Sequence, residues 1–317
     1  MELYNDISEI PKAETVSGLT VGKFEGIHLG HQRLFKRLSG YCSSNSLTSA
    51  VIAFRNDPRD VTGDSDHVEH MIYTLKDREK FILECGIERT IFIPFNQNMA
   101  EIPADSFIQD IVLDRMKAQY FVCGEDFRFG RGREGDAHSC VHICEANGCR
   151  TEIEPEFTYS GVKVSSSSIC SLILNGDFQQ ASKYLGRKYH IEGTVHRGLG
   201  IGKMLGFPTL NIWYPDEVIV PEGIFAATAE IEGREYHAAV NSGKRPTIGK
   251  NGKNIVEVHL LTETVPDNVK HIKLYPVAKV RDEITFTNTD DLSDQIREDC
   301  RRIEQILTTT DRVASHG

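Results

Sequence analysis

The sequence predicts an α/β domain built on a doubly wound parallel sheet, followed by a small antiparallel β-barrel and a C-terminal helix. Three observations predict this fold class. Strand-like apolar runs alternate with helical patterns in the first half, short β-like runs separated by turns fill the second half, and an amphipathic helical pattern lies near the end. A chain of 317 residues is long enough for two domains. We expect these domains to span residues 1–186 and 187–317.

The first half begins with an apolar strand end and a turn, after which Leu34 and Leu38 repeat at helical spacing. Further strands are predicted at Ser49–Phe54, Thr90–Pro94 and Gln119–Cys123, and helices at Leu75–Cys85 and Ser106–Met116. Strands that alternate with helices favour a parallel sheet, in which ligands bind at the carboxyl ends of the strands.

The second half follows a helical pattern at Ile169–Tyr184 that is interrupted by a turn at residues 175–177. Closely spaced strands are then expected, which is typical of a small barrel. Their ranges are Ile191–Val195, Leu210–Trp213, Gly223–Ile231, Arg234–Val240 and Val256–Leu261. The last helix, Asp290–Leu307, carries its apolar residues on one face, and we expect it to cover one end of the barrel.

Two loops of the first half are candidate phosphate sites. His28 and His31 frame Gly30 where a helix begins, and imidazoles beside the unpaired N–H groups of a helix start can bind phosphates. The alternative is a pair of surface histidines. The loop CGEDFRFGRGREG, residues 123–135, gathers Arg128, Arg131 and Arg133 among glycines, which suits a polyphosphate better than a solvated loop.

A glycine-rich stretch, GTVHRGLGIGKMLGFPTLN at residues 193–211, is the candidate phosphate loop of the second half. Its glycines allow N–H groups to approach anionic oxygens, and two cations lie nearby. The glycines are Gly198, Gly200, Gly202 and Gly206, and the cations are Arg197 and Lys203. In the extended segment that follows, alternation points Thr209 and Asn211 the same way, as two oxygen ligands for Mg²⁺. A glycine-rich hairpin between two strands is the alternative.

Composition excludes several classes. A net charge of −10 argues against a general nucleic-acid binder. There is no apolar run of 18 residues and no signal-peptide pattern in MELYNDISEI, so we expect no membrane association and a cytoplasmic protein. The cysteines are scattered except for Cys140, Cys144 and Cys149 near His142, and reduced, packed thiols are favoured there over a metal site. We interpret VHICEAN, residues 141–147, as a strand that enters a turn.

These motifs resemble a known family. GKFEGIHLGH resembles the GNFDGxHxGH motif of the FAD synthetase module in bifunctional bacterial riboflavin kinase/FMN adenylyltransferases. GEDFRFG resembles the second motif of the same module. That module is an HxGH nucleotidylyltransferase. The resemblance runs from about Thr20 to Asp299. It implies that His28 and His31 hold ATP phosphates and stabilise the transition state of AMP transfer to FMN, with pyrophosphate released. It also implies a set of nucleotide-binding residues: Gly22, Phe24, Gly30, Asp126, Lys163, Ser165 and Ser166.

The first module departs from the family pattern at three places. The ISSTxxR signature is read here as VSSSSIC, so Cys170 replaces the closing arginine. Lys23 stands where the family has asparagine, and FxPHP is altered to FRNDP, residues 54–58. A thiol supplies no charge for a phosphate. Adenylyl transfer is therefore either rearranged around Lys23 and Arg55 or largely lost.

The second half resembles riboflavin kinase. Its motifs are GFPTxN at residues 206–211, NSGKRPT at 241–247 for NIGxRPT, and IVEVHLL at 255–261 for VEVHLL. The resemblance implies that Glu257 takes the proton from the ribityl 5′-hydroxyl as it attacks ATP. On spacing alone Glu257 is a solvent-facing strand residue. Asp282 and Glu283 resemble the LRxE stretch, and no chemistry is assigned to them.

The leading interpretation is an enzyme that uses ATP and Mg²⁺ to convert riboflavin into FMN and then FMN into FAD. ADP and pyrophosphate are the by-products. The nearest alternative is a riboflavin kinase with a degenerate nucleotide-binding first domain, and a third is a regulator that senses flavins or nucleotides without turnover. No nucleic-acid partner is expected, and the oligomeric state is left open.

Overall fold

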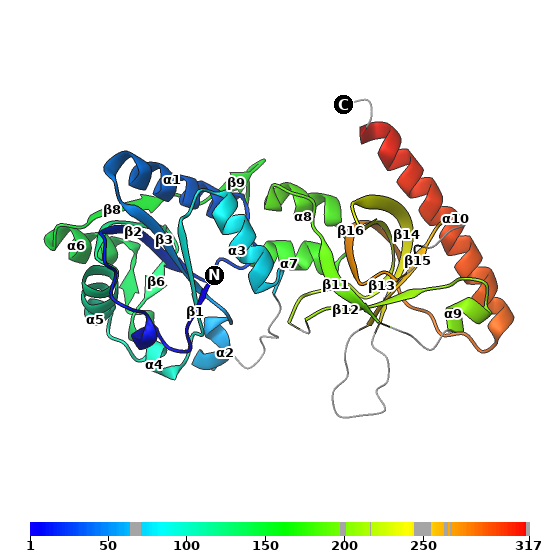
Figure 1. The fold of residues 1–317 in the computed structure, drawn as a ribbon, viewed down its shortest axis with the longest axis horizontal. Helices are drawn as coiled ribbons and strands as arrows, with labels where there is room; N and C mark the ends of the chain where they lie inside the picture. The colour runs from blue at the N-terminus through cyan, green and yellow to red at the C-terminus, as the bar shows by residue number, and fades with distance from the viewer. Residues whose placement is uncertain are drawn as a thin grey trace. The chain divides into compact units, whose positions relative to one another are not determined.

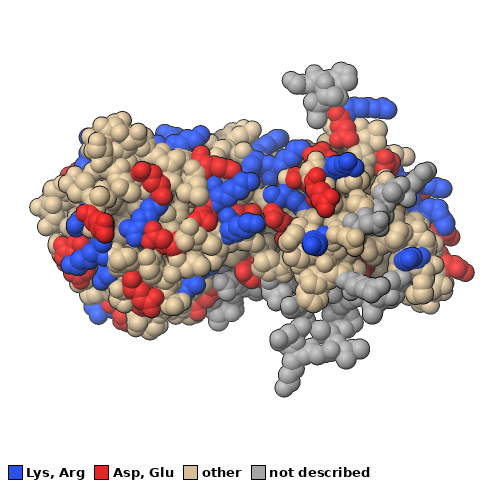
Figure 2. All heavy atoms as spheres, viewed as in Figure 1, with Lys and Arg blue, Asp and Glu red and all other residues tan. Residues whose placement is uncertain are grey.

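The protein is described by a computed structural model that covers residues 1–63, 71–196, 201–215, 217–243, 255–262, 266 and 268–314. The chain divides into two compact units, residues 1–166 and 167–317. The expected boundary after residue 186 remains a prediction, and residues 167–186 belong to the second unit in this division. Acidic and basic side chains are interspersed over both units on the face shown in Figure 2.

The first unit is built on a parallel sheet with the strand order β1-β4-β3-β2-β5-β8. Figure 1 labels β1, β2, β3 and β8 of this sheet. The strands are β1 (Glu2–Leu3), β2 (Ser17–Gly22), β3 (Thr48–Phe54), β4 (Arg89–Ile93), β5 (Ala118–Gly124) and β8 (Arg150–Glu154). Strand β2 lies between β3 and β5, so the chain winds outward from it in both directions. Such a reversal of strand order is where open parallel sheets bind ligands, and the loops after Gly22 and Gly124 meet there.

Helices connect the strands. They are α1 (Leu29–Asn45), α2 (Pro58–Thr62), α3 (Leu75–Glu84), α4 (Gln97–Ala100), α5 (Ala104–Ser106), the π-helix η2 (Phe107–Arg115) and α6 (Ala137–Ala146), with 3-10 turns η1 (Ile7–Glu9) and η3 (Arg131–Arg133). The side chains of Thr74 and Asp136 cap α3 and α6 by accepting main-chain N–H groups. Short ribbons β6 (Arg128–Phe129) with β7 (Gly135–Asp136), and β9 (Thr158–Tyr159) with β10 (Val162–Lys163), complete the unit.

The second unit is a closed antiparallel barrel with the order β11-β12-β15-β14-β13-β16. The strands are β11 (Ile191–His196), β12 (Leu210–Trp213), β13 (Gly223–Ile231), β14 (Arg234–Gly243), β15 (Ile255–Leu260) and β16 (His271–Arg281). Its helices are α7 (Ser166–Leu174), α8 (Phe178–Leu185), α9 (Ile201–Met204) and α10 (Thr289–Ala314). The fold class predicted from the sequence is confirmed for both units.

Helix α10 lies along the outer wall of the barrel. Ile303 and Leu307 pack on Ala226 of β13 and Val280 of β16. Ala226 alternates with the fully buried Phe225, so the two side chains face opposite sides of β13. Phe225 packs instead against Phe178 of α8. The expectation that the last helix covers one end of the barrel was wrong.

Two further expectations differ from the structure. Residues 141–146 lie in helix α6 and Asn147 is its C-cap; Cys140 and Cys144, four residues apart, are both fully buried on one helical face. Strand β16 was missed in the sequence because Pro276, a residue that disfavours strands, lies in its middle. This strand closes the barrel by pairing with β11 and β13.

Candidate functional site

The first unit has a cavity of about 260 Å³ at the carboxyl ends of β2 and β5. Both loops that meet where the strand order reverses contribute to it, as does the segment around β10. Seven residues predicted from the sequence line this cavity together: His28, Gly30, His31, Asp126, Lys163, Ser165 and Ser166. The structure therefore brings the HLGH turn, the GEDFRFG loop and the serine motif to one place.

The two histidines are stacked at the start of α1. Their ring centroids lie 3.7 Å apart at an angle of 20°. Nδ1 of His28 accepts the main-chain N–H of His31 at 3.4 Å, so His28 is also the cap of α1. A side chain at Gly30 would lie 3.1 Å from the ring of His28. Glycine thus leaves room for the imidazoles beside the positive end of the helix.

Gly22 and Phe24 do not line the cavity, and they lie behind it. The ring of Phe24 contacts His31 edge-on, with centroids 5.2 Å apart at 88°. A Cβ at Gly22 would lie 2.9 Å from that same ring. Phe24 thus packs against His31, and Gly22 leaves room for its ring, while contact of either residue with a nucleotide stays a prediction.

Charges around the cavity are mixed. The buried carboxylate of Glu154 pairs with Arg33 at 2.5 Å and with Arg37. Lys163 pairs with Glu156, and this hydrogen bond raises the pKa of Lys163 above its ordinary value. The ammonium group is therefore charged at neutral pH on the cavity lining.

Several cations expected near phosphates lie elsewhere. Nζ of Lys23 is 2.6 Å from both Glu25 and Asp57, and Arg55 donates to the carbonyl oxygen of Tyr4 at 3.1 Å. Neither side chain lines the cavity, which argues against a phosphate site rearranged around them. The arginines at 128, 131 and 133 are exposed and also lie outside the lining. Phe127 and Phe129 of this loop pack with the hydrophobic core, so the loop helps to stabilise the fold of the first unit.

The thiols near residue 140 are packed in the core of the first unit. Cys140, Cys144 and Cys149 are buried, whereas His142 is exposed. Sγ of Cys140 and Cys144 are 4.0 Å apart. In the described part of the chain, the group of ligand atoms close enough to share an ion does not include any cysteine. The preference for packed thiols agrees with this geometry.

The second unit has a cavity of about 270 Å³ between the wall of the barrel, the segment 281–286 and the first half of α10. Thr209, Asn211 and Glu257 all line it. Asn211 of β12 pairs with Glu257 of β15, and Glu257 pairs in turn with Asn241 of β14. Paired residues point to the same side of a sheet, and neighbouring strands are about 4.8 Å apart. The three polar side chains form one row across the cavity wall.

Of the residues in the glycine-rich stretch, some line the cavity and others do not. Gly202 lines the cavity, and a Cβ there would lie 2.4 Å from the carbonyl oxygen of Phe207 and 3.2 Å from Oγ1 of Thr209. Lys203 and Gly206 are exposed and lie outside the lining, with Gly206 at a φ of +87°. Gly200, together with Arg197 and Gly198, lies outside the described residues. The phosphate-loop prediction is therefore untested at those positions.

The remaining cavity wall combines an apolar surface with an ion pair. Its apolar residues come from the loop before β12, from the barrel and from α10: Leu205, Phe207, Ile224, Ala239, Ile284, Phe286, Leu292 and Ile296. Arg281 of β16 pairs with the buried Asp299 of α10 at 2.6 Å, and Gln295 donates to the same carboxylate at 2.9 Å. These contacts attach α10 to the barrel beside the cavity.

Two lining residues were not predicted as functional. Oδ1 of Asn241 is buried and, within the described residues, lacks a hydrogen-bond partner. Glu283 lines the cavity, and its carboxylate occupies the space that a side chain at Gly243 would fill. Both belong to motifs that the sequence already singled out, NSGKRPT and VRDE. Strand pairing with Glu257 is the signal that could have identified Asn241.

Comparison with known proteins agrees with this arrangement of two sites. The family model of FAD synthetase matches residues 10–168, and that of riboflavin kinase matches residues 185–307. The chain belongs to the riboflavin kinase/FMN adenylyltransferase (FAD synthetase) family. The first match contains the cavity with the stacked histidines, and the second contains the row Asn211, Glu257 and Asn241.

Curated relatives in this family match over nearly their whole length. A bifunctional riboflavin kinase/FMN adenylyltransferase from Haemophilus influenzae is 29% identical, with 94% of this chain and 97% of the relative covered. One from Buchnera aphidicola is 27% identical, with 96% and 98% covered. A crystal structure from Streptococcus pneumoniae, described as a macrolide-efflux protein, is 25% identical with a TM-score of 0.80 and covers 94% of this chain and 96% of that one. Within the described residues, no helix is both long and apolar enough to cross a membrane.

Proposed function

We propose that the chain makes FAD from riboflavin in two ATP-dependent steps, each in its own unit. The second unit transfers the γ-phosphoryl group of ATP to the 5′-hydroxyl of riboflavin and releases ADP. The first unit joins the resulting FMN to AMP from a second ATP and releases pyrophosphate. Family membership supports both steps, and we further propose that they take place in the cytoplasm, where ATP is available.

The single observation that carries the kinase proposal is the position of Glu257 between Asn211 and Asn241. The Glu257 carboxylate accepts the proton of the attacking hydroxyl, the hydroxyl oxygen forms a bond to the γ-phosphorus, and the bond from that phosphorus to ADP breaks. Asn241 lies on the opposite side of Glu257 from Asn211. Its buried Oδ1 accepts a hydrogen bond from a ribityl hydroxyl, which satisfies an oxygen that has no donor among the described residues.

The donor set on the other side fits Mg²⁺. A threonine hydroxyl and an asparagine amide oxygen are hard ligands, and the small number of protein ligands suits an ion that keeps waters and phosphate oxygens. Thr209 and Asn211 would hold the ion, which when bound neutralises charge on the transferred phosphate. The apolar wall that includes Phe207 and Phe286 excludes water and packs against the flavin ring.

Adenylyl transfer is assigned to the cavity with the stacked histidines. His28 and His31 donate hydrogen bonds to ATP phosphates, and Lys163 adds a fixed positive charge near Ser165 and Ser166. A phosphate oxygen of FMN attacks the α-phosphorus, and pyrophosphate leaves. This reaction requires positioning and stabilisation of charge, so it needs no covalent enzyme intermediate.

The test is to incubate the full chain with riboflavin, ATP and Mg²⁺ and to separate the flavins by chromatography over time. We expect FMN to form first and FAD to follow. FMN without FAD would leave only the kinase, in agreement with the loss of the motif arginine at Cys170. Unchanged riboflavin would contradict both assignments.

A further inference from the structure

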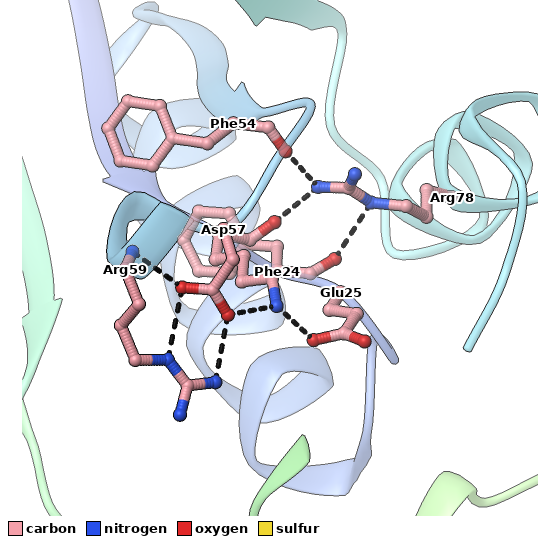
Figure 3. A network of polar contacts seen from close by, with 7 residues as sticks. Phe24, Glu25, Phe54, Asp57, Arg59 and Arg78 are labelled. Carbon is pink, nitrogen blue, oxygen red and sulfur yellow. Dashed lines mark hydrogen bonds and ion pairs between the residues drawn. The ribbon is translucent and has the colours of Figure 1, made fainter. Parts of the chain in front are cut away.

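Arg78 of α3 is a fully buried cation in the first unit. Its Nε donates to the carbonyl oxygen of Phe24 at 3.2 Å, and Nη2 donates to the carbonyl oxygens of Phe54, at 2.8 Å, and Lys23. Figure 3 shows the guanidinium directed at these three oxygens. Burial lowers the pKa of Arg78 to about 10, so the side chain is still charged at neutral pH. A buried charge is costly unless it is well hydrogen-bonded, which raises the question of what this one does.

The acceptors of Arg78 lie on both sides of a strained residue. Phe24 has a φ of +44°, in the left-handed region that residues other than glycine rarely adopt. Such a conformation is strained and persists only where the surroundings determine it. The carbonyls of Lys23 and Phe24 belong to the two peptide groups that flank the Cα of Phe24. One guanidinium therefore holds both.

The strained residue in turn supports a histidine of the cavity. The ring of Phe24 contacts His31 edge-on at 5.2 Å and Phe35 at 4.8 Å, and His31 stacks on His28 at 3.7 Å. If the peptide groups at Phe24 were released, its ring would be free to rotate away from His31. The path from Arg78 to the cavity thus has two links, the clamped backbone of Phe24 and its ring.

We propose that Arg78 is a positioning residue for adenylyl transfer, which fixes the imidazole of His31 by clamping the backbone of Phe24. This inference rests on the proposed function of the first unit. It differs from a purely structural role, in which Arg78 would satisfy carbonyl oxygens at the ends of β2 and β3 and affect stability alone.

The experiment compares Arg78→Met and Arg78→Lys in the full chain, with FAD formation from supplied FMN measured well below the unfolding temperature of each variant. We expect kcat to fall about 10- to 100-fold in Arg78→Met with little change in KM for FMN, because displacement of a catalytic group acts on the chemical step. Arg78→Lys should recover part of the loss. An unchanged kcat with a lower unfolding temperature would overturn the proposal.

Arg115 offers a matched control in the same unit. It also donates to main-chain carbonyls, those of Ser8 at 2.9 Å and Ile10 at 2.5 Å, but it does not line the cavity. Arg115→Met should leave kcat for FAD formation within about 2-fold of the wild type, because distant sites act nearly independently. An equal loss of kcat in both methionine variants would also overturn the proposal.

A second readout does not depend on turnover. NMR spectra of chain labelled in its histidines, with His31→Gln used for assignment, should show the His31 signals displaced in Arg78→Met and unmoved in Arg115→Met. If the wild type makes no FAD, the assignment of adenylyl transfer fails, whereas the spectra still decide the role of Arg78. If Arg78→Met does not fold, Phe24→Leu removes the same ring contact, and unmoved His31 signals in that variant would contradict the proposal.

Discussion

Asn211 and Glu257 are paired across β12 and β15, so their side chains lie next to each other on the wall of one cavity. They come from motifs about 46 residues apart, on two strands that the closed barrel makes neighbours. Asn241 continues this polar strip on the far side of Glu257, and Thr209 lies two residues before Asn211 along the chain and also lines the cavity. This single strip can hold a metal, a proton acceptor and a substrate hydroxyl in order, and each part can be tested separately.

Glu257→Gln removes the proton acceptor and keeps the shape of the side chain. We expect kcat for FMN formation to fall about 10²- to 10⁴-fold, the usual contribution of a general base. KM for riboflavin should change little, because the amide still fills the same space. The matched measurement is FAD formation from supplied FMN, which depends on the other unit and should stay at the wild-type rate. A kinase rate within a few-fold of wild type would exclude Glu257 as the base.

Asn241→Leu replaces an amide by an apolar side chain of similar size. If Oδ1 accepts a hydrogen bond from a ribityl hydroxyl, the variant should bind riboflavin about 5- to 10-fold more weakly than the wild type does. This ratio corresponds to the loss of one hydrogen bond of about 1–1.5 kcal/mol. Lumiflavin, which has a methyl group in place of the ribityl chain, should bind wild type and variant equally. Titration by flavin fluorescence measures both. Equal weakening of both flavins would indicate a general disturbance of the cavity.

His237 gives the second unit a predicted dependence on pH. It lies 2.9 Å from Asp311 and 3.3 Å from Glu304, both on α10. Burial alone would lower the pKa of His237, but the hydrogen bonds with these carboxylates outweigh it and raise the pKa above its ordinary value. Because the folded pKa is above the unfolded value of about 6.5, this stabilisation is complete below about pH 6.5 and is lost as the pH rises through the folded pKa.

To test this dependence, the midpoint of urea unfolding of the barrel is measured at several pH values. The signal is the fluorescence of Trp213, the only tryptophan of the chain. The midpoint should fall above about pH 6.5, and His237→Gln should flatten this part of the profile. His138→Gln, an exposed histidine of the first unit, serves as the control. A profile that falls equally in His237→Gln would assign the dependence to other groups.

Cys170→Arg restores the cation that closes the serine motif in the family pattern. We expect the rate of FAD formation to rise, by up to about 10²-fold if one phosphate contact is regained. FMN formation should not change. Cys170→Ser, which adds no charge, is the control variant, and a similar gain in both would attribute the effect to loss of the thiol. No gain would indicate that phosphate binding depends on groups such as Lys163.

Much of this architecture could be predicted from the sequence, because hydrophobic period and turn residues determine it. β12 and β13 begin and end at the expected residues, and the HLGH turn and the GEDFRFG loop lie at the carboxyl ends of the parallel strands, where they were expected. Residues 141–147 were mistaken for a strand because the cysteine and isoleucine in these seven residues fit the spacing of a helix and the alternation of a strand equally well. The clamp by Arg78 could not be predicted, since an arginine in an amphipathic helix normally lies on its solvent face.

The attachment of α10 to the outer wall determines when the barrel acquires the cavity that we propose as the flavin site. Leu292, Ile296 and the Arg281–Asp299 ion pair complete the cavity, yet they depend on the last helix of the described chain. A shortened protein that stops after β16 would retain the strands that carry Thr209, Asn211 and Glu257 but would leave their pocket open to water. During synthesis on the ribosome, the adenylyltransferase can therefore mature well before the kinase that supplies its substrate.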